Sequence, residues 1–138
     1  LKDIKLNSFV DPLVPGVTCH VASIEANLSL SDPSDSAVSC RQTGEITPEM
    51  IARIKKGKTG EVVFEKSKSV FLKTLKIRRI FDEESQTLMY LSYSTRETSG
   101  SFKHSLSTIP LWGTAAYVQP QSKSQSVEQN KSSTEQSF

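Results

Sequence analysis

The sequence feature that most constrains the fold is a series of three β-forming segments between residues 60 and 95. GEVVFEK (Gly60–Lys66) and SVFLKTLKIRRIF (Ser69–Phe81) are rich in branched and aromatic residues, and TLMYLSYST (Thr87–Thr95) follows them. Such runs, bounded by turn residues, are typical of β-strands. The polar stretch Asp82–Gln86 predicts a turn, so the last two segments are expected to form an antiparallel hairpin with a loop of about five residues.

The longest segment places charged residues on both sides of a strand. Lys76 and Arg78 share one side, and the basic side chains are interpreted as extending to solvent and pairing with carboxylates across strands. The alternative is an anion-binding or partner-binding surface around Lys76 and Arg78. Because side chains alternate along a strand, the other side is expected to carry Phe71, Lys73, Leu75, Ile77, Arg79 and Phe81.

Shorter strands are expected on either side of this region. Pro12 and the pair Pro15-Gly16 are turn signals in the N-terminal part, and Pro110 limits pairing to an edge strand in the C-terminal part. The strands predicted from alternating patterns are Ile4–Phe9, Val17–Ser23, Ala37–Gln42 and Ser105–Trp112.

One helix is predicted in ITPEMIARIKKG. Thr47 is a suitable N-cap, and Pro48 falls at the first helical position. Ile51 and Ile54 give the helix an apolar face that would pack on a sheet, and Gly57 is predicted to end it in the left-handed conformation.

These elements predict a mainly β (α+β) fold. We expect a single antiparallel sheet or a partly closed barrel with one short helix packed on it. The β-rich domain is expected to span residues 1–117, and residues 118–138 are expected to form a disordered Ser/Gln-rich tail. Thirteen of the twenty residues from Gln119 to Phe138 are Ser, Gln, Thr or Asn, which is too polar a composition to bury a core.

The two cysteines, Cys19 and Cys40, both fall on the apolar side of predicted strands. An even number of cysteines suits a disulfide in an oxidising compartment. The alternative is a pair of buried, reduced thiols in a cytosolic protein. Zinc is not favoured, because the 21-residue spacing has no second cysteine pair to complete a ligand set.

Composition and motifs exclude several function classes. A net charge of +2 is too small to indicate nucleic-acid binding, and no apolar run is long enough to span a membrane. The sequence has no nucleophile elbow, phosphate loop or zinc-protease motif, so neither a cofactor nor a metal is expected. His20 is placed on the side away from Cys19. His104 has Ser101, Ser105 and Ser107 near it in sequence, which leaves a Ser-His hydrolase as an alternative.

Five stretches of this chain resemble the CreA family of small bacterial envelope proteins. They are VTCHVAS, SDSAVSCRQTGEI, GEVVFEKSKSVFLKTLKIRRIFD, YLSYS and GSFKHSLSTIPLW, in order between Ile4 and Trp112. The resemblance implies a disulfide between Cys19 and Cys40 and export to the periplasm of a Gram-negative bacterium. It also implies a signal peptide, and a chain that opens at Leu1 is compatible with the removal of one.

The chain departs from the family pattern at two places. Relatives usually carry a glycine-rich stretch where this chain has IEANLSLSDPSD, and the polar tail is an addition. The family has no established catalytic residues to transfer. We therefore expect a non-enzymatic periplasmic protein that binds a protein or small-molecule partner in the envelope. The alternative is an envelope-acting hydrolase that uses His104 with a nearby serine.

Overall fold

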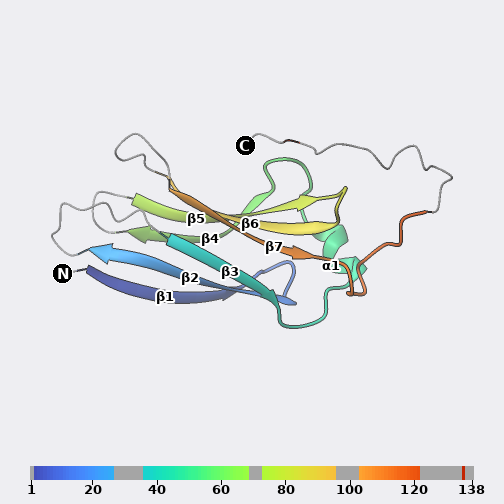
Figure 1. Cartoon of the computed structure of the whole chain (residues 1–138), viewed down its shortest axis with the longest axis horizontal. Coiled ribbons are helices and arrows are strands. Elements are labelled where there is room, and N and C mark those ends of the chain that lie inside the picture. The colour runs from blue at the N-terminus through green and yellow to red at the C-terminus, as the bar shows by residue number, and fades with distance from the viewer. Residues whose placement is uncertain (1, 27–35, 69–72, 96–102, 122–134, 136–138) are drawn as a thin grey trace.

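The computed structural model describes residues 2–26, 36–68, 73–95, 103–121 and 135. The predicted strands and the predicted helix all occur, and the hairpin turn between the two long strands is confirmed. The elements are β1 (Lys2–Val10), β2 (Val17–Ala26), β3 (Ser36–Gln42), α1 (Pro48–Arg53), β4 (Glu61–Lys68), β5 (Lys73–Asp82), β6 (Thr87–Ser94) and β7 (His104–Pro110) (Figure 1).

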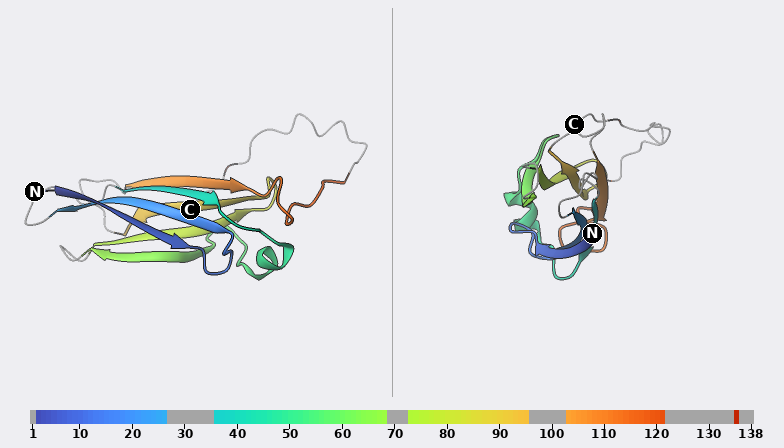
Figure 2. Two further views of the ribbon diagram at one scale, coloured as in Figure 1. Left: turned by 90° about the horizontal axis from the view of Figure 1, so that it is seen from below. Right: turned by 90° about the vertical axis from the view of Figure 1, so that its left-hand side faces the viewer.

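The strands form two antiparallel sheets, so the expectation of a single sheet is wrong. One sheet has the order β1-β2-β3 and the other the order β4-β5-β6-β7, with β7 at an edge as predicted. The two sheets lie face to face as a sandwich (Figure 2). One open sheet would leave the apolar sides of these strands without cover, whereas two sheets bury them against each other. Within the described strands no hydrogen-bonded ladder joins the two sheets into a closed barrel.

Side chains close the two edges of the sandwich. At one edge, β3 lies beside β7, and the Cys40 backbone N–H donates to Ser107 Oγ at 2.9 Å. At the other edge, the rings of Phe9 and Phe64 stack with centroids 4.7 Å apart. The sheets are therefore tied at both edges even though their backbones do not pair.

The core lies between the sheets, and the predicted alternation is confirmed in β2. Val17, Cys19 and Val21 are buried, whereas His20 between them is exposed. The buried cluster consists of Val14, Val17, Cys19, Val21, Cys40, Ile46, Ile54, Leu75, Ile77, Leu88, Tyr90, Ile109, Leu111 and Ala116.

Helix α1 starts as predicted but ends early. The Met50 backbone N–H donates to Thr47 Oγ1 at 3.2 Å, and Pro48 occupies the first turn. The helix stops at Arg53 because Ile54 turns to an extended backbone and buries its side chain in the core. The prediction that Gly57 ends the helix is therefore wrong, although Gly57 has a φ of +113° in the following loop. The helix packs at one end of the sandwich and does not lie across a sheet face (Figures 1 and 2).

A β-bulge in β4 changes which side chains face the core. Glu61 pairs with Arg79 and Val62 with Arg78, but Phe64 pairs with Ile77, so Val63 is an extra residue. The extra residue reverses the alternation. As a result, Glu61 and Phe64 both point inward, although strict alternation would place them on opposite faces.

Most of the predicted tail, residues 122–134 and 136–138, lies outside the described residues, as does Phe71.

Candidate functional site

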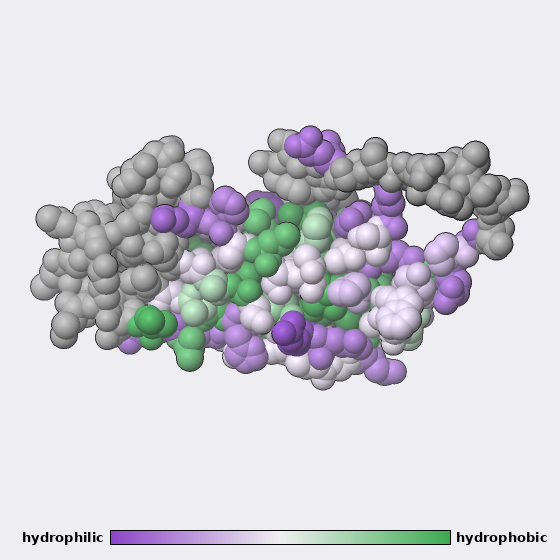
Figure 3. All heavy atoms as spheres, in the orientation of Figure 1, coloured by the Kyte–Doolittle hydropathy of each residue, from purple (hydrophilic) through white to green (hydrophobic). Residues whose placement is uncertain are grey.

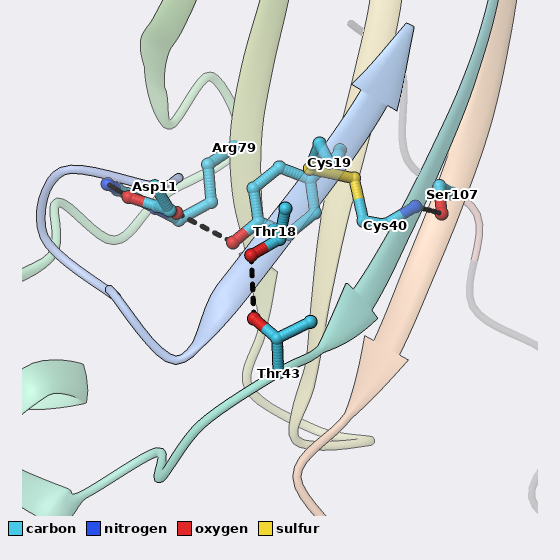
Figure 4. The surroundings of a disulfide bond; sticks show 8 residues. Asp11, Thr18, Cys19, Cys40, Thr43, Arg79 and Ser107 are labelled. Atoms are coloured by element: carbon cyan, nitrogen blue, oxygen red, sulfur yellow. Dashed lines mark hydrogen bonds and ion pairs between the residues drawn. A yellow bond between two sulfur atoms is a disulfide. The ribbon is translucent and has the colours of Figure 1, made fainter. Parts of the chain in front are cut away.

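The disulfide between Cys19 and Cys40 is present and joins β2 to β3. The two cysteines are directly opposite in the register, with an S–S distance of 2.11 Å and a Cα–Cα distance of 4.0 Å. Because the Cys40 N–H points to Ser107 and not to β2, the two cysteines form a non-hydrogen-bonded pair, the arrangement in which opposite Cα atoms approach most closely. Both residues are fully buried (Figure 4).

A buried ion pair between Asp11 and Arg79 crosses from one sheet to the other. Arg79 Nε donates to Asp11 Oδ2 at 2.8 Å, and its Nη2 donates to Asp11 Oδ1 at 2.9 Å. Asp11 lies in the turn after β1, and Arg79 lies in β5. The Asp11 side chain is 0% exposed and that of Arg79 is 1% exposed, so the pair is fully withdrawn from solvent.

Two further side chains complete this pair. Tyr90 in β6 donates its hydroxyl to Asp11 Oδ2 at 2.6 Å, and Arg79 Nη1 donates to Glu61 Oε1 at 2.7 Å. Asp11 Oδ1 also accepts the backbone N–H groups of Leu13 and Val14 at 3.0 and 3.3 Å, which fixes the turn between β1 and β2. We refer to Asp11, Glu61, Arg79 and Tyr90 as the inter-sheet network.

The electrostatics of the network favour its charged form. Burial alone raises the pKa of Asp11, but hydrogen bonds from Arg79 and Tyr90 and the charge of Arg79 reverse this, and the net pKa is lowered. The hydrogen bond from Arg79 likewise lowers the pKa of Glu61. Burial lowers the pKa of Arg79, but its hydrogen bonds to both carboxylates outweigh that effect and raise it. Burial, followed by the negative charge of Asp11, raises the pKa of Tyr90, which remains a neutral donor.

The network links the two sheets through polar groups that are engaged with one another. Both oxygens of Asp11 accept hydrogen bonds, and the Arg79 guanidinium is shared between two carboxylates, so these groups are already engaged by protein partners. Sequence reasoning missed Asp11, Glu61 and Tyr90 as partners. The signal for them was Arg79 itself, because a cation within an apolar row needs a buried anion.

Four serines form a second polar feature between the sheets. Ser23 lies opposite Ser36 in the β2–β3 register, and Ser92 lies opposite Ser105 in the β6–β7 register. Ser36 Oγ and Ser92 Oγ are 3.0 Å apart, which links the two pairs across the sandwich. We call Ser23, Ser36, Ser92 and Ser105 the serine row. It lies towards the end of the sandwich remote from α1.

The structure gives Lys76 and Arg78 protein partners. Lys76 Nζ is 4.0 Å from Glu65 Oε1 on the neighbouring strand, which agrees with the interpretation of cross-strand pairing. Arg78 donates to the Tyr93 hydroxyl at 3.0 and 3.3 Å and to the Thr59 carbonyl at 3.0 Å. Both residues are half-buried on the outer face, and the anion-binding or partner-binding surface around them stays a prediction. Arg79 does not extend to solvent as expected, because it is buried in the inter-sheet network.

The predicted pairing of His104 with a nearby serine lacks the required geometry for Ser105 and Ser107. His104 is exposed on the outer side of β7, whereas Ser107 on the same strand points inward and accepts the Cys40 N–H. Ser105 Oγ is buried on that inner side as well. Residues on opposite faces of one strand cannot form a nucleophile–base pair. Ser101 lies outside the described residues.

Two other features are absent from the described residues. No group of three or more His, Cys, Asp or Glu side chains in this part of the chain could hold a metal ion. No helix in it has the length and apolar character needed to cross a membrane.

Comparison with known proteins places the chain in a family. Residues 1–114 match the family described as CreA protein. The chain is 42% identical over 115 residues to Protein CreA of Escherichia coli strain K12, which covers 78% of this chain and 72% of the relative. Protein CreA of the E. coli strains O6:H1 and O157:H7 gives the same identity and coverage. No solved structure matches significantly. Because the family match covers most of the chain and the relatives are 42% identical to it, the chain belongs to the CreA family.

Proposed function

We propose that this chain is a non-enzymatic protein of the bacterial periplasm that acts as a binding or interaction module in the cell envelope. The observation that carries the proposal is the Cys19–Cys40 disulfide, which is fully buried in the core. Disulfides of this kind form and persist in oxidising compartments, of which the periplasm is the bacterial example.

A non-enzymatic role is supported by how the polar groups are used. The buried ionisable side chains of the described core, Asp11 and Arg79 with Tyr90, are engaged with one another. His104 is separated from Ser105 and Ser107 by the sheet. Catalysis by acid–base or nucleophilic groups needs side chains that face a common reacting atom.

An interaction role is supported by apolar side chains on the outer side of β1. Ile4, Leu6 and Val10 share this side and are 72%, 79% and 51% exposed. Apolar side chains grouped on a surface mark interaction sites more often than single ones do. Figure 3 shows apolar atoms on the surface at the end of the sandwich where β1 begins.

The compartment is tested by trapping thiols in intact cells of the bacterium that makes this protein. Free thiols are alkylated before lysis, and the periplasmic fraction is released by osmotic shock. We expect the protein in that fraction, with a Cys19–Cys40 cross-linked peptide in the unreduced digest. Recovery from the cytosolic fraction with both thiols alkylated would contradict the proposal.

The interaction role is tested by in-cell photo-crosslinking at Leu6, with the same crosslinker at Glu84 as the matched control. Glu84 is an exposed residue of the β5–β6 turn, at the opposite end of the sandwich. We expect a defined adduct from position 6 and none from position 84. Equal adducts from both positions, or none from either, count against an interaction through β1. If His104→Ala also abolishes a measured turnover without loss of stability, the hydrolase alternative replaces the proposal.

A further inference from the structure

The serine row brings four hydroxyl-bearing side chains together inside the sandwich. The register pairs Ser23 with Ser36 and Ser92 with Ser105, and the contact between Ser36 Oγ and Ser92 Oγ joins them into one row across β2, β3, β6 and β7. Ser92 is 0% exposed and Ser23 is 2% exposed, whereas Ser36 and Ser105 are half-buried. The row therefore runs from the interior towards the edge at which β3 lies beside β7.

The two ends of the row carry hydroxyls with no protein partner. Ser23 Oγ and Ser105 Oγ are buried, and neither has a hydrogen-bond partner within the described part of the chain. A buried hydroxyl without a partner is unfavourable, and folded proteins satisfy such groups with ordered water or a ligand. The two middle hydroxyls already pair with each other, so the unmet hydrogen-bonding capacity is concentrated at the two ends.

The chemistry of the row favours an uncharged occupant. The row supplies hydroxyls, each of which can both donate and accept a hydrogen bond. The buried cation of the described core, Arg79, is neutralised by Asp11 and Glu61. An ion placed among the serines would lose its hydration without gaining a counter-charge from the row.

We propose that the serine row binds water-sized, uncharged hydroxyl groups at its two ends, one at Ser23 and one at Ser105. Ser23 and Ser105 lie on strands of different sheets, and each of these two unpaired hydroxyls needs a hydrogen-bond partner. Ordered water supplies the required chemistry, and so do the hydroxyls of a small polyol. The inference is independent of the proposed cellular role, because it depends only on hydroxyl groups inside the fold.

The first test compares Ser23→Ala and Ser105→Ala with Ser39→Ala, which removes an exposed hydroxyl from the outer side of β3. If Ser23 and Ser105 each hydrogen-bond to a water molecule, the alanine substitution loses that hydrogen bond. We therefore expect Ser23→Ala and Ser105→Ala each to lower Tm by roughly 3–5 °C relative to Ser39→Ala. A buried hydroxyl without any hydrogen-bond partner destabilises the folded state, so its removal would raise Tm. A rise in Tm for both buried variants overturns the proposal.

The second test identifies the occupant directly. High-resolution crystals of the full chain are grown without polyols, and a second set is soaked in erythritol. Density within hydrogen-bond distance of Ser23 Oγ and Ser105 Oγ in the first set supports water sites, and its replacement by erythritol hydroxyls in the second set assigns polyol binding. Density unchanged by the soak restricts the sites to water. No density at either hydroxyl in either set overturns the proposal, whatever the outcome of the localisation experiment.

Discussion

Asp11 and Arg79 are 68 residues apart in the sequence, yet their side chains form a two-point ion pair in the centre of the fold. The pair attaches the turn after β1 in one sheet to β5 in the other sheet. Glu61 and Tyr90 bring β4 and β6 into the same network, so one guanidinium and one carboxylate position four elements. The ion pair therefore adds a buried polar link between the sheets to the contacts at their edges.

Breaking this pair on one side should be strongly destabilising. Arg79→Met leaves the Asp11 carboxylate in the core without its cation, and we expect it to reduce the free energy of unfolding by about 3–5 kcal/mol. Asp11→Ala leaves Arg79 with Glu61 as its remaining ion partner, so we expect a smaller loss from that change. The double variant should cost less than the sum of the two single changes, because no buried charge is left without its partner. Urea unfolding of all four proteins measures this coupling. The control is Lys76→Met, which removes a 4.0 Å contact with exposed Glu65 and should cost less than about 1 kcal/mol. Equal losses for Arg79→Met and Lys76→Met would show that the network is not a major contributor.

The network should make the protein sensitive to acid. The pKa of Asp11 in the folded protein lies below its ordinary value of 3.8, and that of Glu61 lies below 4.5. A carboxyl whose pKa is lowered by folding contributes stability that is present above its ordinary pKa and is lost as pH falls through the folded value. The free energy of unfolding should therefore decline below about pH 4.5, in a titration of urea midpoints from pH 7 to pH 2. Asp11→Asn should make the free energy of unfolding decline less steeply at low pH. An unchanged decline would show that other carboxyl groups cause it.

Tyr90 should make the free energy of unfolding decrease at alkaline pH. Its pKa is raised above the ordinary value of 10.0, first by burial and then by the charge of Asp11. A group whose pKa is raised by folding contributes stability that is present below its ordinary pKa and is lost as pH rises towards the folded value. Stability should therefore decrease above pH 10, and Tyr90→Phe should reduce that slope. Tyr93→Phe is the matched control, because Tyr93 lies on the same strand and pairs with Arg78 on the outer face. Equal effects of the two variants would contradict this assignment.

Removal of the disulfide should weaken the protein without changing its fold. The bond closes a loop between residues 21 positions apart, and chain-entropy arguments give about 3 kcal/mol for a loop of this size. We expect Cys19→Ala/Cys40→Ala to lower the urea midpoint accordingly while far-UV circular dichroism is retained. Because both cysteines are buried, dithiothreitol should reduce the native protein slowly and the urea-unfolded protein quickly, as followed by alkylation and mass spectrometry. Equally rapid reduction in both conditions would show that the bond is accessible in the folded state.

The bulge in β4 should be essential for the network. Deletion of Val63 restores strict alternation, which turns Glu61 away from Arg79 if the remainder of the strand keeps its register. We expect the deletion to reduce the free energy of unfolding more than Val63→Ala, which keeps the bulge and removes only side-chain packing. Urea midpoints of the two variants measure the difference. A deletion no more costly than the alanine change would mean that the strand can re-pair without this bulge.

Much of the local structure follows from the sequence because it depends on near neighbours. The alternating pattern at Val17, Cys19 and Val21 identifies an inward-facing side of β2, and it is buried as expected. Thr47 and Pro48 start the helix because an N-cap hydroxyl and a fixed φ act within one turn. The end of the helix is not local in this sense. Ile54 leaves the helix to reach the core, before the chain arrives at Gly57.

Long-range relationships required the tertiary structure. The sequence placed Arg79 in an apolar row, but nothing in the nearby residues identifies Asp11 as its partner, because Asp11 lies in the turn after β1 and Arg79 in a strand of the other sheet. The bulge at Val63 places Glu61 and Phe64 on the same side of β4, whereas strict alternation predicts opposite sides. The serine row likewise depends on the register of two strand pairs and on how the sheets face each other.

The sequence by itself determined the strands, the helix start and the inward positions of both cysteines, because these depend on side-chain alternation and capping over a few residues. Only the tertiary structure decided that the strands divide into two sheets, that Asp11 and Arg79 meet, and that four serines share one row. Each of these depends on which faces can be buried together, a choice made by the packing of the whole chain.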